Sequence, residues 1–174
     1  MNNCLFSQTQ YRWGLAGGVN AARLINSTED TKPINGFHVG LIGEAKYNDH
    51  FGVKLGALSS SKGSIFKEKD NLNQIHEKEF KLTYVDIPIL ANWYFLKVFS
   101  FQIGTQTSFL LNAEYQGDSV KNKLKITDIG VISGIGFDAY VLNAAIRYNY
   151  GLLDIGSGIG KNSVLQITLG LWIK

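Results

Sequence analysis

The sequence predicts an all-β protein, an eight-stranded antiparallel up-and-down transmembrane β-barrel. Three observations predict it: apolar and polar residues alternate with a period of two, long and short connections alternate, and glycines gather on the polar phase. The composition agrees, because 10 Phe, 8 Tyr and 3 Trp with only 2 Pro favour strands. No run of 18 apolar residues occurs, so a transmembrane helix is not predicted.

Eight segments follow the period of two. They are residues 11–25, 37–47, 51–65, 80–95, 99–111, 126–140, 143–150 and 163–173. In the fifth segment, Phe99 and Phe101 alternate with Ser100 and Gln102. A helix would scatter these side chains around its surface, because its period is 3.6 residues. We therefore predict eight strands.

The fourth segment, 80–95, has an irregular pattern. Its apolar phase changes near Tyr84 and Val85, after which Ile87 and Ile89 share one face. A β-bulge adds one residue to a strand and shifts its phase in this way. We therefore expect a bulge in this segment.

The connections alternate regularly in length. The long ones cover about 26–35, 67–78, 113–124 and 152–162, and the short ones about 48–50, 96–98 and 141–142. Transmembrane barrels have short periplasmic turns and longer outer loops. The long connections and their flanks carry charges of both signs, Lys62, Glu77 and Lys121 among them, which we interpret as a solvated face.

Glycines on the polar phase indicate which phase faces inward. An eight-stranded interior is only just wide enough for its side chains, so small residues such as Gly14 and Gly130 suit it. The predicted interior polar cluster consists of Glu44, Lys46, Lys54, Asp86, Asp128 and Arg147, with Asp138 on the same phase. Because isolated buried charges are costly, we expect these residues to pair and fill the barrel structurally. An ion path is the alternative.

Aromatic residues gather near both ends of the predicted strands. The predicted membrane-interface aromatics are Trp13, Tyr47, Trp93 and Phe99 near the short turns, and Tyr148 near the long loops. Such rings are expected at the two boundaries between lipid and water.

Five motifs extend over nearly the whole chain from about Trp13. They are Gly-Phe-His-Val-Gly (36–40), Tyr-Val-Asp-Ile-Pro (84–88), Asp-Ile-Gly to Gly-Ile-Gly (128–136), Arg-Tyr-Asn-Tyr-Gly-Leu (147–152) and Leu-Gln-Ile-Thr-Leu-Gly (165–170). Together they resemble the PorT-like outer-membrane β-barrel family of Gram-negative bacteria. The resemblance implies an eight-stranded barrel in the bacterial outer membrane.

An outer-membrane protein must be exported. We interpret residues 1–10 as a signal-peptide remnant or disordered N-terminus, so that the signal peptide is missing or truncated, and residues 11–174 as a single barrel domain. The expected partners are outer-membrane lipid, the barrel-assembly machinery and an extracellular or periplasmic protein. Nucleic acid is not expected, because a net charge of +3 is a weak bias.

Catalytic, cofactor and metal sites are not predicted. Cys4 is the single cysteine, the three histidines stand apart in the sequence, and neither Cys-x-x-Cys nor His-Glu-x-x-His occurs. We therefore predict a non-enzymatic protein with a structural, adhesive or accessory role in secretion or the envelope.

Two alternatives remain open. A soluble lipocalin-like barrel that binds an apolar ligand would place the apolar phase inside. An outer-membrane lipid-modifying hydrolase would need His38 beside a serine at the lipid face or rim, and would lose activity in His38→Ala. The candidate serines are Ser59, Ser60, Ser61 and Ser64.

Overall fold

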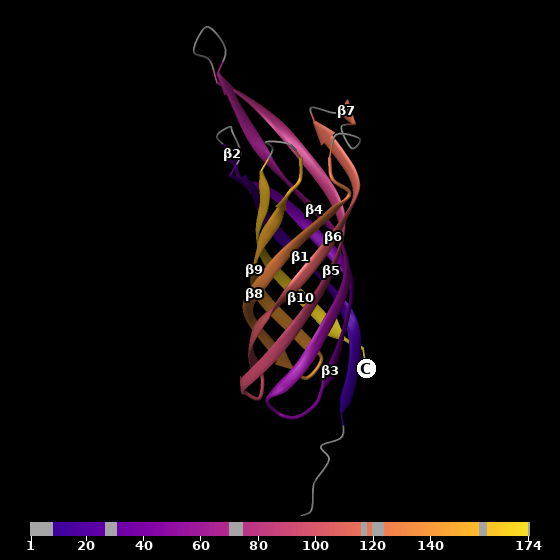
Figure 1. Cartoon of the computed structure of the whole chain (residues 1–174). Coiled ribbons are helices and arrows are strands. Elements are labelled where there is room, and N and C mark those ends of the chain that lie inside the picture. The colour runs from indigo at the N-terminus through magenta and orange to yellow at the C-terminus, as the bar shows by residue number, and fades with distance from the viewer. Residues whose placement is uncertain are drawn as a thin grey trace, which may run out of the picture.

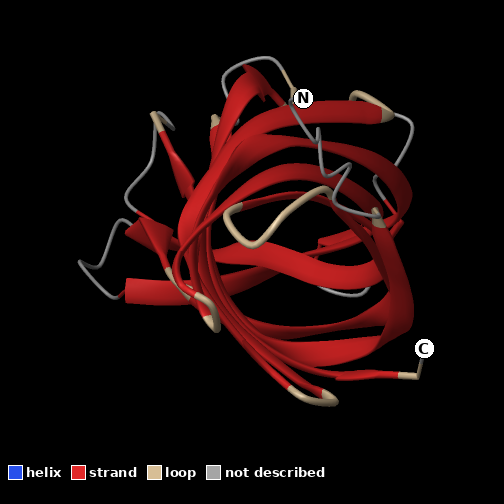
Figure 2. Ribbon diagram, turned by 90° about the horizontal axis from the view of Figure 1, so that it is seen from below, coloured by secondary structure: helices blue, strands red, loops and turns tan. Residues whose placement is uncertain are grey.

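The computed structural model describes residues 9–26, 31–69, 75–115, 118–119, 124–156 and 160–173. The eight long strands are β1 (Gln10–Ile25), β3 (Ile34–Lys46), β4 (Phe51–Lys69), β5 (Ile75–Leu96), β6 (Phe99–Tyr115), β8 (Thr127–Ala139), β9 (Leu142–Asp154) and β10 (Lys161–Trp172). Each pairs antiparallel with the next, and β1 pairs with β10, which closes the barrel (Figure 2). The predicted eight-stranded fold is confirmed. None of the described residues forms a helix long and apolar enough to cross a membrane.

Two further strands have only two residues each. β2 (Thr31–Lys32) pairs with β4, and β7 (Asp118–Ser119) pairs with β6. Residues 1–8, which belong to the predicted N-terminal remnant, lie outside the described residues, and β1 begins at Gln10.

Tight turns join the strands at one end of the barrel, which we call the turn end (Figure 1). In the first turn, Asn48 Oδ1 accepts hydrogen bonds from the backbone N–H groups of His50 and Phe51, each 2.8 Å long. In the other two turns, Lys97 and Tyr140 adopt the left-handed region, with φ of 33° and 52°. The short connections are therefore placed as predicted.

The opposite end, the loop end, contains more strand than the sequence predicted. The predicted loop 67–78 is mostly a hairpin, because β4 continues to Lys69 and β5 begins at Ile75 (Figure 1). Similar extensions of β6, β9 and β10 shorten the predicted loops 113–124 and 152–162. The period of two misses such extensions, because it detects a strand only where apolar and polar residues alternate.

The predicted bulge is on the wrong strand. β5 keeps a single phase, with both Leu82 and Tyr84 buried inside the barrel. The register irregularity there lies in β6, where Leu111 is the extra residue between the partners of Thr83 and Tyr84. The sequence pattern indicates the wrong strand because the interior is apolar at the level of Leu82 and Tyr84. Inward and outward residues are therefore both apolar there, and the pattern does not distinguish them.

Burial shows which phase faces inward. Phe101 and Ile167 are about half exposed on the outer surface, whereas their neighbours Gln102 and Thr168 are buried inside. Apolar side chains cover the outside of the barrel and polar side chains fill most of its interior, as predicted. The soluble lipocalin-like alternative needs the reverse arrangement and is therefore wrong.

Gly18 illustrates why the inward phase needs glycine. A Cβ atom at this position would lie 1.9 Å from the backbone oxygen of Ile167 and 2.9 Å from His38 Cε1. Since the backbone oxygen cannot rotate away, we expect Gly18→Ala to lower the free energy of unfolding by about 1–3 kcal/mol. The measurement is urea unfolding of the barrel in lipid vesicles.

Gly43→Ala is the matched control for this prediction. The atom nearest to a Cβ at Gly43 is the backbone oxygen of Arg12, 3.8 Å away, which is an ordinary contact. We expect this variant to unfold close to wild type. Equal stabilities for the two alanine variants would contradict the steric account.

Candidate functional site

The barrel interior has three levels, which are the candidate site. The turn-end cluster consists of Arg12, Glu44, Lys54, Asn92, Tyr94, Asp138, Asn143 and Trp172. The middle layer consists of Lys62, Tyr84, Asp86, Gln106, Ser108, Asp128, Arg147, Asn149, Asn162 and Gln166. The loop-end apolar cluster consists of Leu24, Phe66, Phe80, Leu82, Tyr84, Leu110, Ala113 and Ile155, with Tyr84 shared between two levels.

Glu44 is the first of two carboxylates in the turn-end cluster. Its Oε2 accepts a hydrogen bond from Arg12 Nε at 2.7 Å, and the same guanidinium forms an ion pair with it. Its Oε1 accepts from Asn92 Nδ2 at 2.5 Å and from Tyr94 Oη at 2.7 Å. Both oxygens of this buried carboxylate are thus satisfied.

Asp138 is the second carboxylate. Asn143 Nδ2 and Trp172 Nε1 donate to its Oδ1 at 2.8 and 2.9 Å. Lys54 Nζ lies 3.5 Å from its Oδ2, and the Arg12 guanidinium lies 3.3 Å from Oδ1. Two cations therefore balance two carboxylates, and seven strands of the closed barrel meet in this cluster.

Tyr94 joins the two carboxylates. Its hydroxyl oxygen lies 2.7 Å from Glu44 Oε1 and 2.9 Å from Asp138 Oδ2, although it has one proton and donates to one of them at a time. Lys46, a predicted interior residue, lies only partly buried, with its Nζ 4.2 Å from the centre of the Tyr94 ring. Arg12 and Tyr94 are not among the predicted interior residues, although Arg12 shares the inward phase of Gly14 on β1 and Tyr94 shares that of Asp86 on β5.

The middle layer contains three other predicted residues. Lys62 Nζ donates to Asp86 Oδ1 at 2.7 Å, and Asn162 donates to Asp128 Oδ2 at 2.7 Å. Arg147 Nε donates to Gln102 Oε1 at 2.7 Å. Asp86, Asp128 and Arg147 are buried inside the barrel. Lys62 is predicted to lie on the solvated face, and this prediction is wrong because Lys62 is buried inside the barrel.

His38 belongs to the interior and not to a rim. Its Nδ1 lies 2.8 Å from Asn20 Oδ1 and its Nε2 lies 3.0 Å from Thr168 Oγ1, so both ring nitrogens have partners. Asn20 in turn donates to Ser60 Oγ at 3.0 Å. The hydrolase alternative needs this histidine at the lipid face, and its geometry is not supported. Among the described residues, no group of three or more His, Cys, Asp or Glu could hold a metal ion.

The loop-end apolar cluster fills the barrel above the middle layer. The rings of Phe66, Phe80 and Tyr115 meet edge to face, with centroids 5.9 to 6.4 Å apart. Leu82 and Tyr84 are fully buried beneath them. Apolar side chains thus fill the end of the interior that lies farthest from the tight turns.

The predicted interface aromatics all point outward. Trp13, Tyr47, Trp93, Phe99 and Tyr148 are 38 to 51% exposed. The first four lie near the turn end, where Trp93 stacks on Phe101 with centroids 6.0 Å apart. Their role at a membrane boundary stays a prediction.

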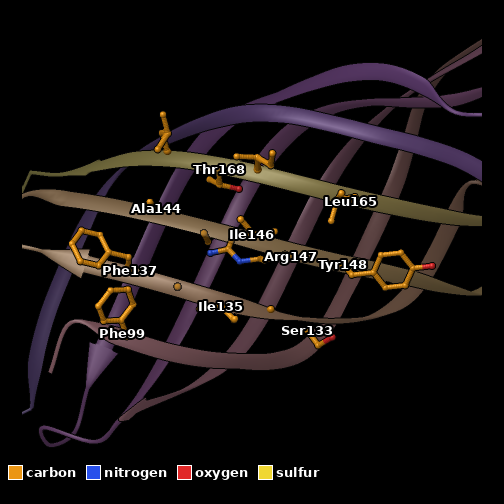
Figure 3. A pocket seen from close by; sticks show the side chains of 15 residues that line it. Phe99, Ser133, Ile135, Phe137, Ala144, Ile146, Arg147, Tyr148, Leu165 and Thr168 are labelled. Atoms are coloured by element: carbon orange, nitrogen blue, oxygen red, sulfur yellow. The ribbon is translucent and has the colours of Figure 1, made fainter. Parts of the chain in front are cut away.

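A shallow apolar hollow lies on the outer face of β8, β9 and β10 (Figure 3). It measures about 650 Å³, with Phe99 and Phe137 at one end, Tyr148 at the other, and the small side chain of Ala144 beside Phe137. An adjoining hollow of about 560 Å³ continues past Ala144 to Gly17 on β1. Small residues thus interrupt the otherwise bulky outer surface.

Comparisons with known proteins agree with this architecture. Residues 6–156 match the family model described as the outer membrane protein beta-barrel domain. No curated protein matches the chain.

Several solved structures are similar to the barrel. They include Ail, the attachment invasion locus protein of Yersinia pestis (TM-score 0.57, 15% identity, covering 94% of this chain and 99% of that one) and Neisserial surface protein A (0.57, 14%, 94% and 96%). The outer membrane protein OprG from Pseudomonas aeruginosa is also similar (0.50, 16%, 94% and 94%). At these identities the likeness shows the fold alone.

Proposed function

The chain belongs to the outer membrane protein beta-barrel domain family, and we propose that this outer-membrane barrel is a non-enzymatic protein whose projecting hairpin attaches to an extracellular partner. Of the structural, adhesive or accessory roles that the sequence predicts, attachment is the adhesive one. We also propose that the chain is related to the PorT-like family in particular, because the five sequence motifs resemble that family. Outer-membrane lipid and the barrel-assembly machinery are the further partners that we propose.

The filled interior supports a role outside the barrel rather than within it. Paired charges fill the turn end, and the rings of Phe66 and Phe80 fill the loop end. Transport or catalysis would need an open route or an accessible polar site, whereas His38 is buried with both nitrogens occupied. We therefore favour attachment over an ion path.

The β4–β5 hairpin is the observation that carries the proposal. The two strands pair with each other as far as Lys69 and Ile75 (Figure 1). Among the described residues, however, β4 has no other neighbour beyond Phe66, and β5 has none beyond Phe80. An exposed strand edge of this kind presents unpaired backbone groups to a partner. One similar structure is that of a protein named for attachment, which agrees with this role.

Truncation of the hairpin tests the proposal. In the variant, Asn-Gly replaces residues 67–77 and makes a two-residue turn between the cross-strand partners Phe66 and Lys78. We expect a folded barrel, but attachment of bacteria that express it to host cells or matrix should fall to the level without the protein. The measurements are heat-modifiable gel mobility and counts of bound bacteria.

The turn end offers a matched control. Tyr140→Asn with Val141→Gly places the same dipeptide in a tight turn at the opposite end of the barrel. This variant should attach like wild type. Unchanged attachment by the truncated hairpin would overturn the proposal.

A further inference from the structure

The middle layer contains buried polar atoms that no described residue satisfies. The acceptors are Asp86 Oδ2, Gln106 Oε1, Asp128 Oδ1, Asn149 Oδ1 and Asn162 Oδ1, with the hydroxyl of Tyr84 beside them, and the donor is Gln166 Nε2. All seven side chains belong to residues that are more than nine-tenths buried. Native proteins leave few such atoms unpaired, and ordered water is the usual partner where protein groups are lacking.

Two charges of this layer are also incompletely paired. Arg147 donates through Nε to Gln102, and none of the ion pairs among the described residues includes Arg147. Asp128 accepts a hydrogen bond from Asn162 on Oδ2, whereas its Oδ1 has no partner among the described residues. A buried guanidinium thus has no ion-pair partner among the described residues, and a buried carboxylate has one oxygen without a hydrogen-bond partner.

The strand register places the unsatisfied amides between these two charges. Gln166 is the cross-strand partner of Arg147. Asn149 is the next inward residue along β9, towards the level of Asp128. Gln106 lies opposite Gly130, the inward residue that follows Asp128. Arg147 and the unpaired donor of Gln166 therefore lie on one side of the layer, and the unpaired acceptors lie mostly on the other.

We propose that the middle layer is a binding site for ordered water molecules that bridge Arg147 and Gln166 to the carboxylate of Asp128. Water fits because it both donates and accepts, and a buried molecule typically makes about three hydrogen bonds. A bound metal cation would satisfy the acceptors but not the amide of Gln166. The charges of the layer are also already balanced in number, since it contains two cations, Lys62 and Arg147, and two carboxylates, Asp86 and Asp128.

Water-to-amide NMR measurements test this proposal. The experiment uses the full barrel, labelled with ¹⁵N, in lipid nanodiscs, and records rotating-frame Overhauser transfer from water to side-chain amides. We expect transfer to the amides of Gln166 and Asn149. Asn20 is the internal control, because its buried amide already donates to Ser60 Oγ at 3.0 Å and to the Ser61 backbone oxygen at 3.1 Å, so no transfer is expected.

Arg147→Met removes the charged donor and should abolish or strongly reduce the Gln166 signal. Arg147→Lys keeps a donor and should retain the signal, and it replaces the methionine variant if that one does not fold. Absence of transfer at both Gln166 and Asn149 in wild type would overturn the proposal, as would equal transfer at Asn20. An anomalous peak at this layer in crystals soaked with rubidium would show a cation instead and would overturn it too.

Discussion

Replacing Asp138 with alanine is expected to lower the free energy of unfolding by about 3–5 kcal/mol. The substitution leaves Lys54 buried without its carboxylate and removes one of the two negative partners of Arg12. It also leaves Asn143 Nδ2 and Trp172 Nε1 without their acceptor. The measurement is urea unfolding in lipid vesicles, followed by tryptophan fluorescence and heat-modifiable gel mobility.

Lys46→Ala is the control at the same end of the barrel. This side chain contacts the Tyr94 ring but joins none of the ion pairs among the described residues, so its loss should cost about 0.5–1 kcal/mol. If Asp138→Ala unfolds like Lys46→Ala, the turn-end cluster does not stabilise the barrel in the way that its contacts indicate.

The second large effect is expected on the outer surface. Ile167→Arg should lower the free energy of unfolding in a bilayer by about 2–4 kcal/mol, because it puts a charge near the middle of the lipid-facing surface. Ile167 is 46% exposed and lies midway along β10, between Ile146 and Val19 on the adjacent strands. The measurement is the same urea titration in vesicles.

Ile126→Arg is the control that separates the effect of depth in the bilayer from the effect of the substitution itself. Ile126 is 63% exposed but precedes β8 at the loop end, where the same change should cost only about 0–1 kcal/mol. Equal losses for the two arginine variants would mean that the bilayer does not cover the barrel in the proposed way.

The period of two predicted the eight strands and the inward direction of most charges. It gives the face of each residue but not its height in the barrel, which depends on the stagger between strands. The contacts of Glu44 with Arg12 and Tyr94 join residues 32 and 50 positions away, so no local pattern reveals them.

The loop end was the less predictable half of the molecule. There the interior becomes apolar at Leu82 and Tyr84, and the β4–β5 hairpin extends beyond its neighbours. Both changes remove the contrast between phases on which the sequence analysis depends. For this reason the sequence predicts the bulge on the wrong strand and Lys62 on the surface, whereas Lys62 lies beside Asp86.

Spin labels placed singly along β10 test the orientation of the barrel most directly. In a Cys4→Ser background, cysteine labels at residues 165 to 171 would be compared in lipid bilayers for their accessibility to oxygen, which concentrates in lipid. We predict high accessibility at Leu165, Ile167, Leu169 and Leu171, and low accessibility at Gln166, Thr168 and Gly170. A reversed alternation, or none, would contradict an apolar face turned towards lipid.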